Sequence, residues 1–310
     1  MNLIDLPNHR KQHEGNIPLI GGIAMFVGFL FGAIFLANGY IQIISLSLIS
    51  FIMLSIGAID DRHEVNFFPK LFLQVLVAVF VVSILGIELK SFGNLFTDDN
   101  VTLGSASLLV TTLAIVGGTN AFNVMDGIDG LASGLALIVF SSILLIAYIG
   151  KVPDIINLSL LYLFILIPFL FFNLSSQNKV FMGDSGTLFI GIGIVWTLII
   201  CSQGQEPLIR PVTALWLYSV PLVDSIATVF MRIKNRKSPF LPDRTHIHHQ
   251  LKSHYRYSNR TILLLIITVS LLMAILGILG EIYFVPEWLM FLNFICLSFG
   301  YLIYLNVLNN

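Results

Sequence analysis

The sequence has 310 residues, of which 56% are hydrophobic and only 11% are charged, and its net charge is −1. A soluble domain of this length is far less apolar, an outer-membrane barrel would show short alternating segments, and no basic tract favours a nucleic-acid partner. The two cysteines, Cys201 and Cys296, lie in or beside apolar runs, without the spacing of a disulfide framework or a zinc site. The composition therefore predicts an all-α polytopic membrane protein.

Apolar runs follow one another along the whole chain and are long enough for membrane helices. They predict about ten transmembrane helices that form one integral membrane domain over residues 1–310. The runs cover residues 17–37, 41–59, 68–86, 105–119, 131–149, 156–173, 186–202, 210–231, 260–280 and 287–307.

The basic residues predict the orientation. If residues 1–16 are cytoplasmic and the runs alternate, every lysine and arginine except Lys90, Lys151 and Arg210 falls on the cytoplasmic side, as the positive-inside rule requires. We therefore expect a plasma (inner) membrane protein with both termini in the cytoplasm. The same topology places the polar motifs of the chain at the cytoplasmic face, so we expect the active site there.

The first polar motif is the stretch TNAFNVMDGIDGLASG, residues 119–134, which interrupts the apolar runs with Asn120, Asn123, Asp126 and Asp129. Acids beside membrane helices are costly and usually functional. Asp126 and Asp129 are three residues apart, so they share one face if the segment is helical. Two acids with neighbouring glycines suit a metal–phosphate ligand, although a capped helix start at the membrane boundary is the alternative.

Two further acidic motifs lie at the ends of runs. Asp60 and Asp61 close the second run, and because adjacent residues do not share a helix face, one of them can point inward and the other outward. A solvated helix end is the alternative, but acids at a helix C-terminus oppose the macrodipole. Asp184 directly precedes the seventh run, where it is either a helix cap or a metal ligand beside a phosphate.

The remaining polar residues lie near the eighth run. Asp224 is within that run, where an acid usually faces a cavity or a partner. The segment PDRTHIHHQ then brings Arg244 together with His246, His248 and His249. It has no zinc-site spacing, and an exposed polar loop is the alternative. Clustered acids at one membrane face imply a divalent cation, and the basic residues imply a phosphorylated ligand. The pattern is typical of metal-assisted phosphoryl chemistry.

The motifs also resemble those of one family. The stretches DLPNHRKQH with IPLIGG, IDDRHEVN, NAFNVMDGIDGLASG, VFMGDSGTLFIG and PDRTHIHHQL span residues 5–251. They are similar to motifs of the polyprenyl-phosphate N-acetylhexosamine-1-phosphate transferases, whose superfamily includes phospho-MurNAc-pentapeptide translocase. The His-Ile-His-His order is similar to the branch that uses UDP-GlcNAc. Members usually have one more transmembrane helix before the first motif, so we expect that helix to be absent here.

The resemblance implies that UDP-GlcNAc and undecaprenyl phosphate give undecaprenyl-pyrophosphoryl-GlcNAc and UMP, the first step of a cell-surface polysaccharide such as lipopolysaccharide O-antigen. It also implies Mg²⁺, or Mn²⁺, as cofactor and membrane lipid as surroundings, and it leaves a homodimer open. By resemblance, the metal ligands are Asp184, Asp60 and Asp61, and the catalytic residues are Asp60, Asp126 and Asp129. The substrate-binding residues are Asn120, Asn123, Arg244, His246, His248 and His249.

Three alternatives stay open at this point. The donor can be another UDP-N-acetylhexosamine, because the sugar rests on analogy alone. The reaction can be a single displacement by the lipid phosphate or can pass through a phospho-aspartate at Asp126 or Asp129; a phosphate monoester is already largely dianionic at pH 7, which favours the first. An ion-coupled transporter would also carry intramembrane acids, but it would place them near the midplane and often shows an internal repeat.

Overall fold

The computed structural model describes residues 3–5, 15–36, 41–96, 99–238 and 245–309. Apart from the two-residue strands β1 (Ile4–Asp5) and β2 (Ile17–Pro18), which pair antiparallel, the regular structure in these residues is helical. The bundle consists of α1 (Gly21–Leu36), α2 (Ile41–His63), α3 (Phe67–Leu85), the 3₁₀ turn η1 (Gly104–Ala106), α4 (Ser107–Asn123), α5 (Leu131–Gly150), α6 (Pro153–Asn173), α7 (Gly183–Ser202), α8 (Pro211–Leu217), α9 (Ser219–Lys234), α10 (Ile247–Tyr255), α11 (Asn259–Ile282) and α12 (Glu287–Asn309).

The all-α polytopic architecture predicted from composition is confirmed. Eight helices in the described part of the chain are long and apolar enough to cross a membrane, and the bent pair α8–α9 would make a ninth span. Helix α1, with 16 residues, is shorter. A helix lies on each predicted apolar run, but run 210–231 is not the single straight span that its length suggests.

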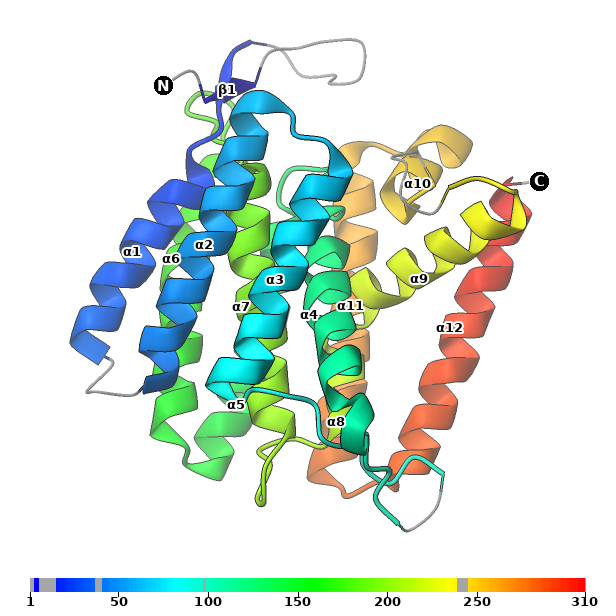
Figure 1. The fold of residues 1–310 in the computed structure, drawn as a ribbon. Coiled ribbons are helices and arrows are strands. Elements are labelled where there is room, and N and C mark those ends of the chain that lie inside the picture. The colour runs from blue at the N-terminus through cyan, green and yellow to red at the C-terminus, as the bar shows by residue number, and fades with distance from the viewer. Residues whose placement is uncertain (1–2, 6–14, 37–40, 97–98, 239–244, 310) are drawn as a thin grey trace.

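That run is divided into α8 and α9, whose axes differ by 82°. Tyr218 separates the two helices, and Pro221 lies in the first turn of α9. Proline has no N–H to donate to the carbonyl of Leu217, so the helical hydrogen-bond ladder is interrupted where the chain bends. The Tyr218 hydroxyl donates to the Gly118 carbonyl at 2.8 Å, which fixes the bend against α4. Figure 1 shows α9 running obliquely toward α12.

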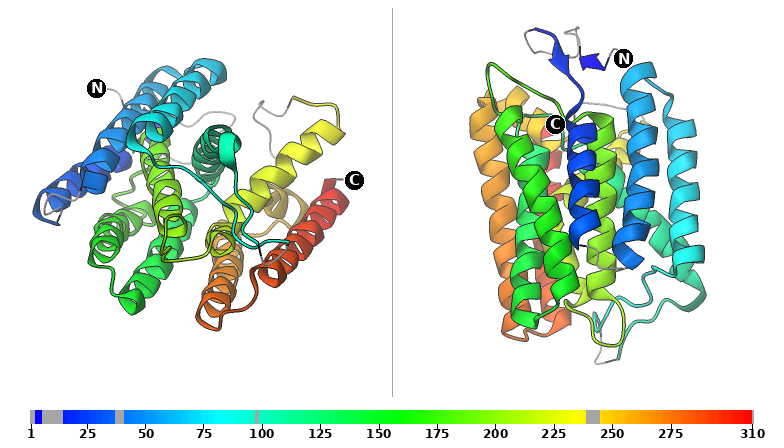
Figure 2. Two further views of the ribbon diagram at one scale, coloured as in Figure 1. Left: turned by 60° about the horizontal axis from the view of Figure 1, so that its bottom comes forward. Right: turned by 90° about the vertical axis from the view of Figure 1, so that its left-hand side faces the viewer.

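Helix α7 lies at the centre of the bundle and packs against α1, α2 and α4 (Figures 1 and 2). Neighbouring helices cover it on all sides, and 94% of its apolar stretch is buried, as expected of a helix with no exposed face. At its start, α1 and α2 approach backbone to backbone. A Cβ atom on Gly22 would collide with Gly186, and one on Gly57 would collide with Asp184, so only glycine permits this contact.

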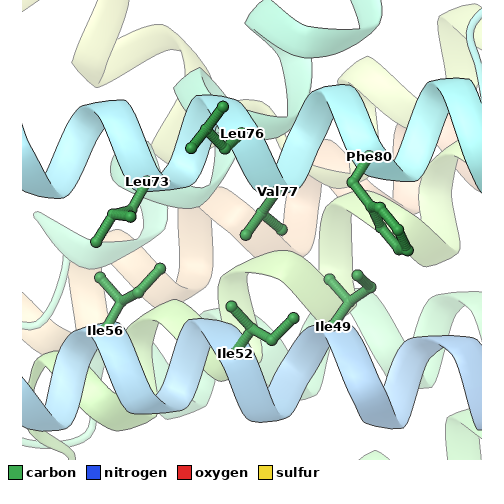
Figure 3. A pocket seen from close by; sticks show the side chains of 7 residues that line it. All are labelled: Ile49, Ile52, Ile56, Leu73, Leu76, Val77 and Phe80. Carbon is green, nitrogen blue, oxygen red and sulfur yellow. The ribbon is translucent and has the colours of Figure 1, made fainter.

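The helices that surround α7 expose apolar side chains outward, as a lipid environment requires. One shallow groove of about 280 Å³ lies between α2 and α3 (Figure 3). All of its lining side chains are apolar: Ile49, Ile52, Ile56, Leu73, Leu76, Val77 and Phe80. The groove therefore offers contact to hydrocarbon but no polar chemistry.

The polar motifs do not lie on these apolar sides but at one end of the bundle. β1, α10 and the C-terminal end of α12 lie together at this end, whereas the connections from α3 to α4 and from α7 to α8 lie at the other (Figure 1). Helix α10 was not expected from the sequence, because it lies in the long polar segment between the runs 210–231 and 260–280.

Candidate active site

A cavity of about 1540 Å³ opens at the polar end of the bundle. It is lined by five of the six acids singled out in the sequence, Asp60, Asp61, Asp126, Asp129 and Asp184, but not by Asp224. Basic and imidazole side chains line it as well: Lys179, Lys252, Arg260, His248 and His249. The fold therefore gathers opposite charges from segments up to 255 residues apart around one cavity, as Asp5 and Arg260 illustrate.

Asp60 and Asp184 share one ammonium group. Lys70, in the first turn of α3, places Nζ at 2.5 Å from Asp60 Oδ2 and at 2.8 Å from Asp184 Oδ2. The backbone amide of Val65 donates to the other Asp60 oxygen at 2.7 Å. A positive charge between two carboxylates removes their mutual repulsion. Lysine thus supplies part of the compensation that the sequence argument assigned entirely to a divalent cation.

Asp61 contacts the backbone at the first turn of α7. Its Oδ1 accepts the Asp184 amide at 2.7 Å and its Oδ2 accepts the Ser185 amide at 3.0 Å. These N–H groups have no partner inside the helix, and a carboxylate satisfies them while also complementing the helix dipole. Gly183, at φ 69°, leaves room for the carboxylate, since a Cβ atom there would press on it. Asp60 and Asp61 both line the cavity, so the arrangement with one inward and one outward carboxylate is not found.

Asn123 and Asn120 differ in their surroundings. Asn123 lines the cavity, and its amide donates to Asp184 Oδ1 at 3.0 Å and to the Thr187 hydroxyl at 2.6 Å. Asn120, one turn earlier in α4, donates to the buried Gln74 at 2.5 Å and to the Val116 carbonyl at 2.8 Å. The structure therefore places Asn123, but not Asn120, at the cavity wall.

Asp126 and Asp129 lie in the connection between α4 and α5, residues 124–130, which is a series of turns. The segment is not helical, so Asp126 and Asp129 do not share a helix face, but both line the cavity. Lys179 pairs with Asp129 at 2.6 Å. Burial raises the pKa of Asp126 well above its usual range, and the nearby charges of Asp184 and Asp129 raise it further.

The histidine motif forms the start of α10. His248 lines the cavity but is only 2% exposed, and it packs against Gly127, where a Cβ atom would collide with its ring. Burial and then the neighbouring His249 lower the pKa of His248 to about 3, so this imidazole is neutral at pH 7. His249 also lines the cavity, whereas His246 is buried beside Asp224. Arg244 lies outside the described residues.

Sequence reasoning missed the lysines that complete the charge pattern. In the sequence, Lys70 and Lys179 served only to predict the membrane orientation, although each forms an ion pair with a predicted site acid. A lysine in the first turn of an apolar run is unusual enough to have marked Lys70 as a partner of an acid. Thr187 gave no signal in the sequence, because its role depends on Asn123 from another helix.

Comparisons with known proteins agree with this site. The family model of glycosyl transferase family 4 matches residues 43–202, which include the acidic motifs of α2, of the α4–α5 connection and of α7. Three relatives carry the name undecaprenyl-phosphate alpha-N-acetylglucosaminyl 1-phosphate transferase. The Yersinia pestis protein is 37% identical over 98% of this chain and 84% of its own length. The proteins of Haemophilus influenzae and Salmonella typhi are 39% and 36% identical, over 97% of this chain and 86% and 83% of their own lengths.

The family match covers more than half of the chain, and the similarity to these relatives extends over almost all of it. The chain therefore belongs to glycosyl transferase family 4 and is a multi-pass membrane enzyme.

Proposed function

We propose that this enzyme transfers GlcNAc-1-phosphate from UDP-GlcNAc to undecaprenyl phosphate. An oxygen of the lipid phosphate attacks the β-phosphorus of the nucleotide sugar, and the bond from that phosphorus to the bridging oxygen breaks. The electron pair leaves with UMP, and the product is undecaprenyl-pyrophosphoryl-GlcNAc. The names of the relatives support undecaprenyl phosphate as the acceptor and GlcNAc-1-phosphate as the transferred group. The observation that carries the proposal is a large cavity, at the end of a membrane bundle, that is lined by both carboxylates and cations.

The chemical obstacle is charge, because an anionic phosphate must approach an anionic diphosphate. Lys179, Lys252 and Arg260 line the cavity and can attract both substrates electrostatically. Lys70 holds Asp60 and Asp184 in fixed positions at the wall. Positioning and electrostatic stabilisation are the main sources of catalysis in phosphoryl transfer, and these side chains supply both.

We propose Mg²⁺, or Mn²⁺, as the cofactor. The residues present fit it, because Asp60 Oδ2 and Asp184 Oδ2 already converge on a cationic group, the Lys70 ammonium. Within the described residues no three acidic, histidine or cysteine side chains form a ready cluster. Mg²⁺ needs only one or two carboxylates when substrate phosphates and water complete its shell. When bound, it would neutralise diphosphate charge and stabilise the departing UMP.

The ligand set that we propose is narrower than the one the sequence suggested. Asp184 and Asp60 keep carboxylate oxygens at the cavity wall. Both oxygens of Asp61 accept backbone amides of α7, so we assign Asp61 to holding that helix and not to the metal. Its effect on the reaction is then indirect, through the position of Asp184.

We propose a single displacement. A phospho-aspartate route needs an ionised, accessible carboxylate as the nucleophile. The raised pKa of Asp126 favours its neutral acid form, which is a poor nucleophile, and Asp129 is paired with Lys179. Enzyme mixed with UDP-GlcNAc alone should therefore release no stoichiometric burst of UMP. A burst that disappears in Asp126→Asn or in Asp129→Asn would establish the covalent route.

The decisive experiment measures UMP release by the purified protein in lipid nanodiscs. We expect release that requires UDP-GlcNAc, undecaprenyl phosphate and Mg²⁺ together, that stops in EDTA and that returns when Mg²⁺ is added back. UDP-GalNAc in place of UDP-GlcNAc tests the sugar. The absence of lipid-dependent UMP release would overturn the proposed reaction, and full activity in EDTA would overturn the metal.

We further propose that the protein lies in the plasma (inner) membrane with the cavity on the cytoplasmic side, where nucleotide sugars are available. In a variant with Cys201→Ala and Cys296→Ala, the substitution Ser253→Cys should react with impermeant reagents only from the cytoplasm. Asn100→Cys, near the opposite end of the bundle, should react only from outside. The reverse pattern would contradict the orientation that the basic residues predict.

A further inference from the structure

Asp224 is a buried carboxylate that joins three separate helices. It lies on α9, is 1% exposed, and has a partner for each of its oxygens. Its Oδ2 lies 2.7 Å from Nδ1 of His246, directly before α10. Its Oδ1 accepts the backbone amide of Ile247 at 3.0 Å and the hydroxyl of Tyr301, on α12, at 2.5 Å.

These contacts hold the N-terminus of α10. His246 occupies the N-cap position, but its side chain does not cap the helix, and Asp224 of another helix accepts the first amide instead. A carboxylate at this point satisfies an N–H group that the helix leaves free and is favoured by the helix dipole. In neutral His246, the contact with Asp224 also places the proton on Nδ1, which fixes the tautomer and the orientation of the ring.

Helix α10 needs such an anchor. It has nine residues, and a helix this short is not stable by itself in water. It presents His248, His249 and Lys252 to the cavity. The carboxylate, together with the packing of α10 against α11 and α12, sets where these side chains stand.

We propose that Asp224 and Tyr301 are positioning residues for the nucleotide-sugar donor, acting through the placement of α10. Neither residue is among those that line the cavity, so neither is assigned a contact with substrate. The last helix of the chain thereby becomes part of the active-site architecture. The inference rests on the proposed function, because it names the substrate that α10 serves.

The assignment to donor binding follows from the two walls of the cavity. Asp60 and Asp184, which Lys70 holds together from behind the lining, form the wall of fixed charges that acts on the reacting phosphates. The α10 wall offers imidazoles and an ammonium, which suit the anionic nucleotide sugar in its ground state. A loss of ground-state binding raises KM and leaves kcat nearly unchanged, whereas partial unfolding lowers the active fraction and leaves KM unchanged.

The test compares Tyr301→Phe with Ser298→Ala, a matched control. Both remove one hydroxyl from α12, but Ser298 donates to the Phe294 carbonyl of its own helix and does not contact Asp224. With saturating lipid, Tyr301→Phe should raise the KM for UDP-GlcNAc by roughly three- to tenfold, because it removes one hydrogen bond from the anchor. Ser298→Ala should match the wild type in both KM and kcat.

Asp224→Asn tests the contact with His246. The asparagine can keep its oxygen toward Ile247 and Tyr301, but it presents an NH₂ group to Nδ1 and so favours the opposite tautomer. We expect the KM for UDP-GlcNAc to rise by roughly tenfold to a hundredfold, since the hydrogen bond that is lost involves a charged group. Calorimetric titration with UDP-GlcNAc, without lipid, should show the same loss of affinity.

The outcomes separate the two proposals. If the wild type releases no UMP, the proposed function fails. If the wild type is active but Tyr301→Phe keeps the KM and the affinity of Ser298→Ala, the role of Asp224 and Tyr301 is refuted. A fall in kcat at unchanged KM would also refute it, since that result indicates lost folded protein. Should Asp224→Asn fail to fold, the Tyr301→Phe result decides.

Discussion

Helices α7 and α10 both begin at an aspartate carboxylate that another helix supplies, but their surroundings differ. Asp61 of α2 accepts two amides at the start of α7, which is buried at the centre of the bundle and touched backbone to backbone by α1 and α2. Asp224 of α9 accepts one amide at the start of α10, a short helix whose second half is exposed. Packing alone thus locates α7 well, whereas α10 depends far more on its carboxylate.

The difference shows how one device can serve two purposes. At α7 the carboxylate satisfies buried donors, so that Asp184 can stand beside Asp60 and Lys70 in a rigid wall. At α10 it sets the position of a second wall, which carries His248 and Lys252. Disturbing the α7 end should therefore lower turnover or stability, and disturbing the α10 end should weaken substrate binding.

The largest effect should come from Lys70→Met, which leaves Asp60 and Asp184 facing each other without the ammonium between them. Removing one positioned electrostatic contact typically costs a factor of about 10² to 10³ in kcat. Lys90→Met is the control, because that lysine is exposed and lies in the connection between α3 and α4, at the other end of the bundle. UMP release measures both variants. A kcat for Lys70→Met within threefold of the control would show that turnover does not depend on the ammonium group between Asp60 and Asp184.

The next effect concerns the stability of the α7 end. Asp61→Ala removes the acceptor of two amides, and leaving buried donors without a partner should lower the free energy of unfolding by about 1 to 3 kcal/mol. We expect a lower melting temperature in nanodiscs. Asp154→Ala is the matched control, because this acid lies in the first turn of α6 but is exposed, and it should melt with the wild type.

The same variant distinguishes the two roles considered for Asp61. If Asp61 only accepts the amides of α7, then Asp61→Ala lowers the melting temperature equally in the presence and in the absence of Mg²⁺. If Asp61→Ala melts like the wild type in EDTA but needs much more Mg²⁺ for turnover, then Asp61 is a metal ligand, as the sequence suggested, and the assignment to α7 is wrong.

The sequence predicted the fold class and the segments that carry the site, because both follow from local patterns. Apolar length marked the helices, and acids beside apolar runs marked the cavity. The bend between α8 and α9 also has a local cause, Pro221, which the hydropathy of the run concealed. The boundaries of the apolar runs and the positions of the charges were therefore enough to indicate which acids lie around one cavity.

The partners of those residues could not be predicted, since they depend on tertiary contacts. Asp61 and Asp184 are 123 positions apart in the hydrogen bond that caps α7, and Asp224 of α9 meets His246, 22 positions later, at the start of α10. From the number of acids at one face, the sequence predicted that a divalent cation offsets their mutual repulsion. In the structure, Lys70 and Lys179 already offset part of that repulsion.

The smallest effect should come from Asn120→Ala, compared with Asn123→Ala one turn later in α4. Asn123 donates to Asp184 and Thr187 in the first turn of α7, so its loss should lower kcat by roughly tenfold to a hundredfold. Asn120 instead donates to Gln74, which is 1% exposed, between α3 and α4. Its loss leaves the Gln74 oxygen without that donor, so the melting temperature should fall while kcat and KM stay within about threefold of the wild type. Equal losses of kcat in both variants would show that the catalytic wall of α7 extends to Asn120 and that substrate reaches deeper between the helices than the cavity indicates.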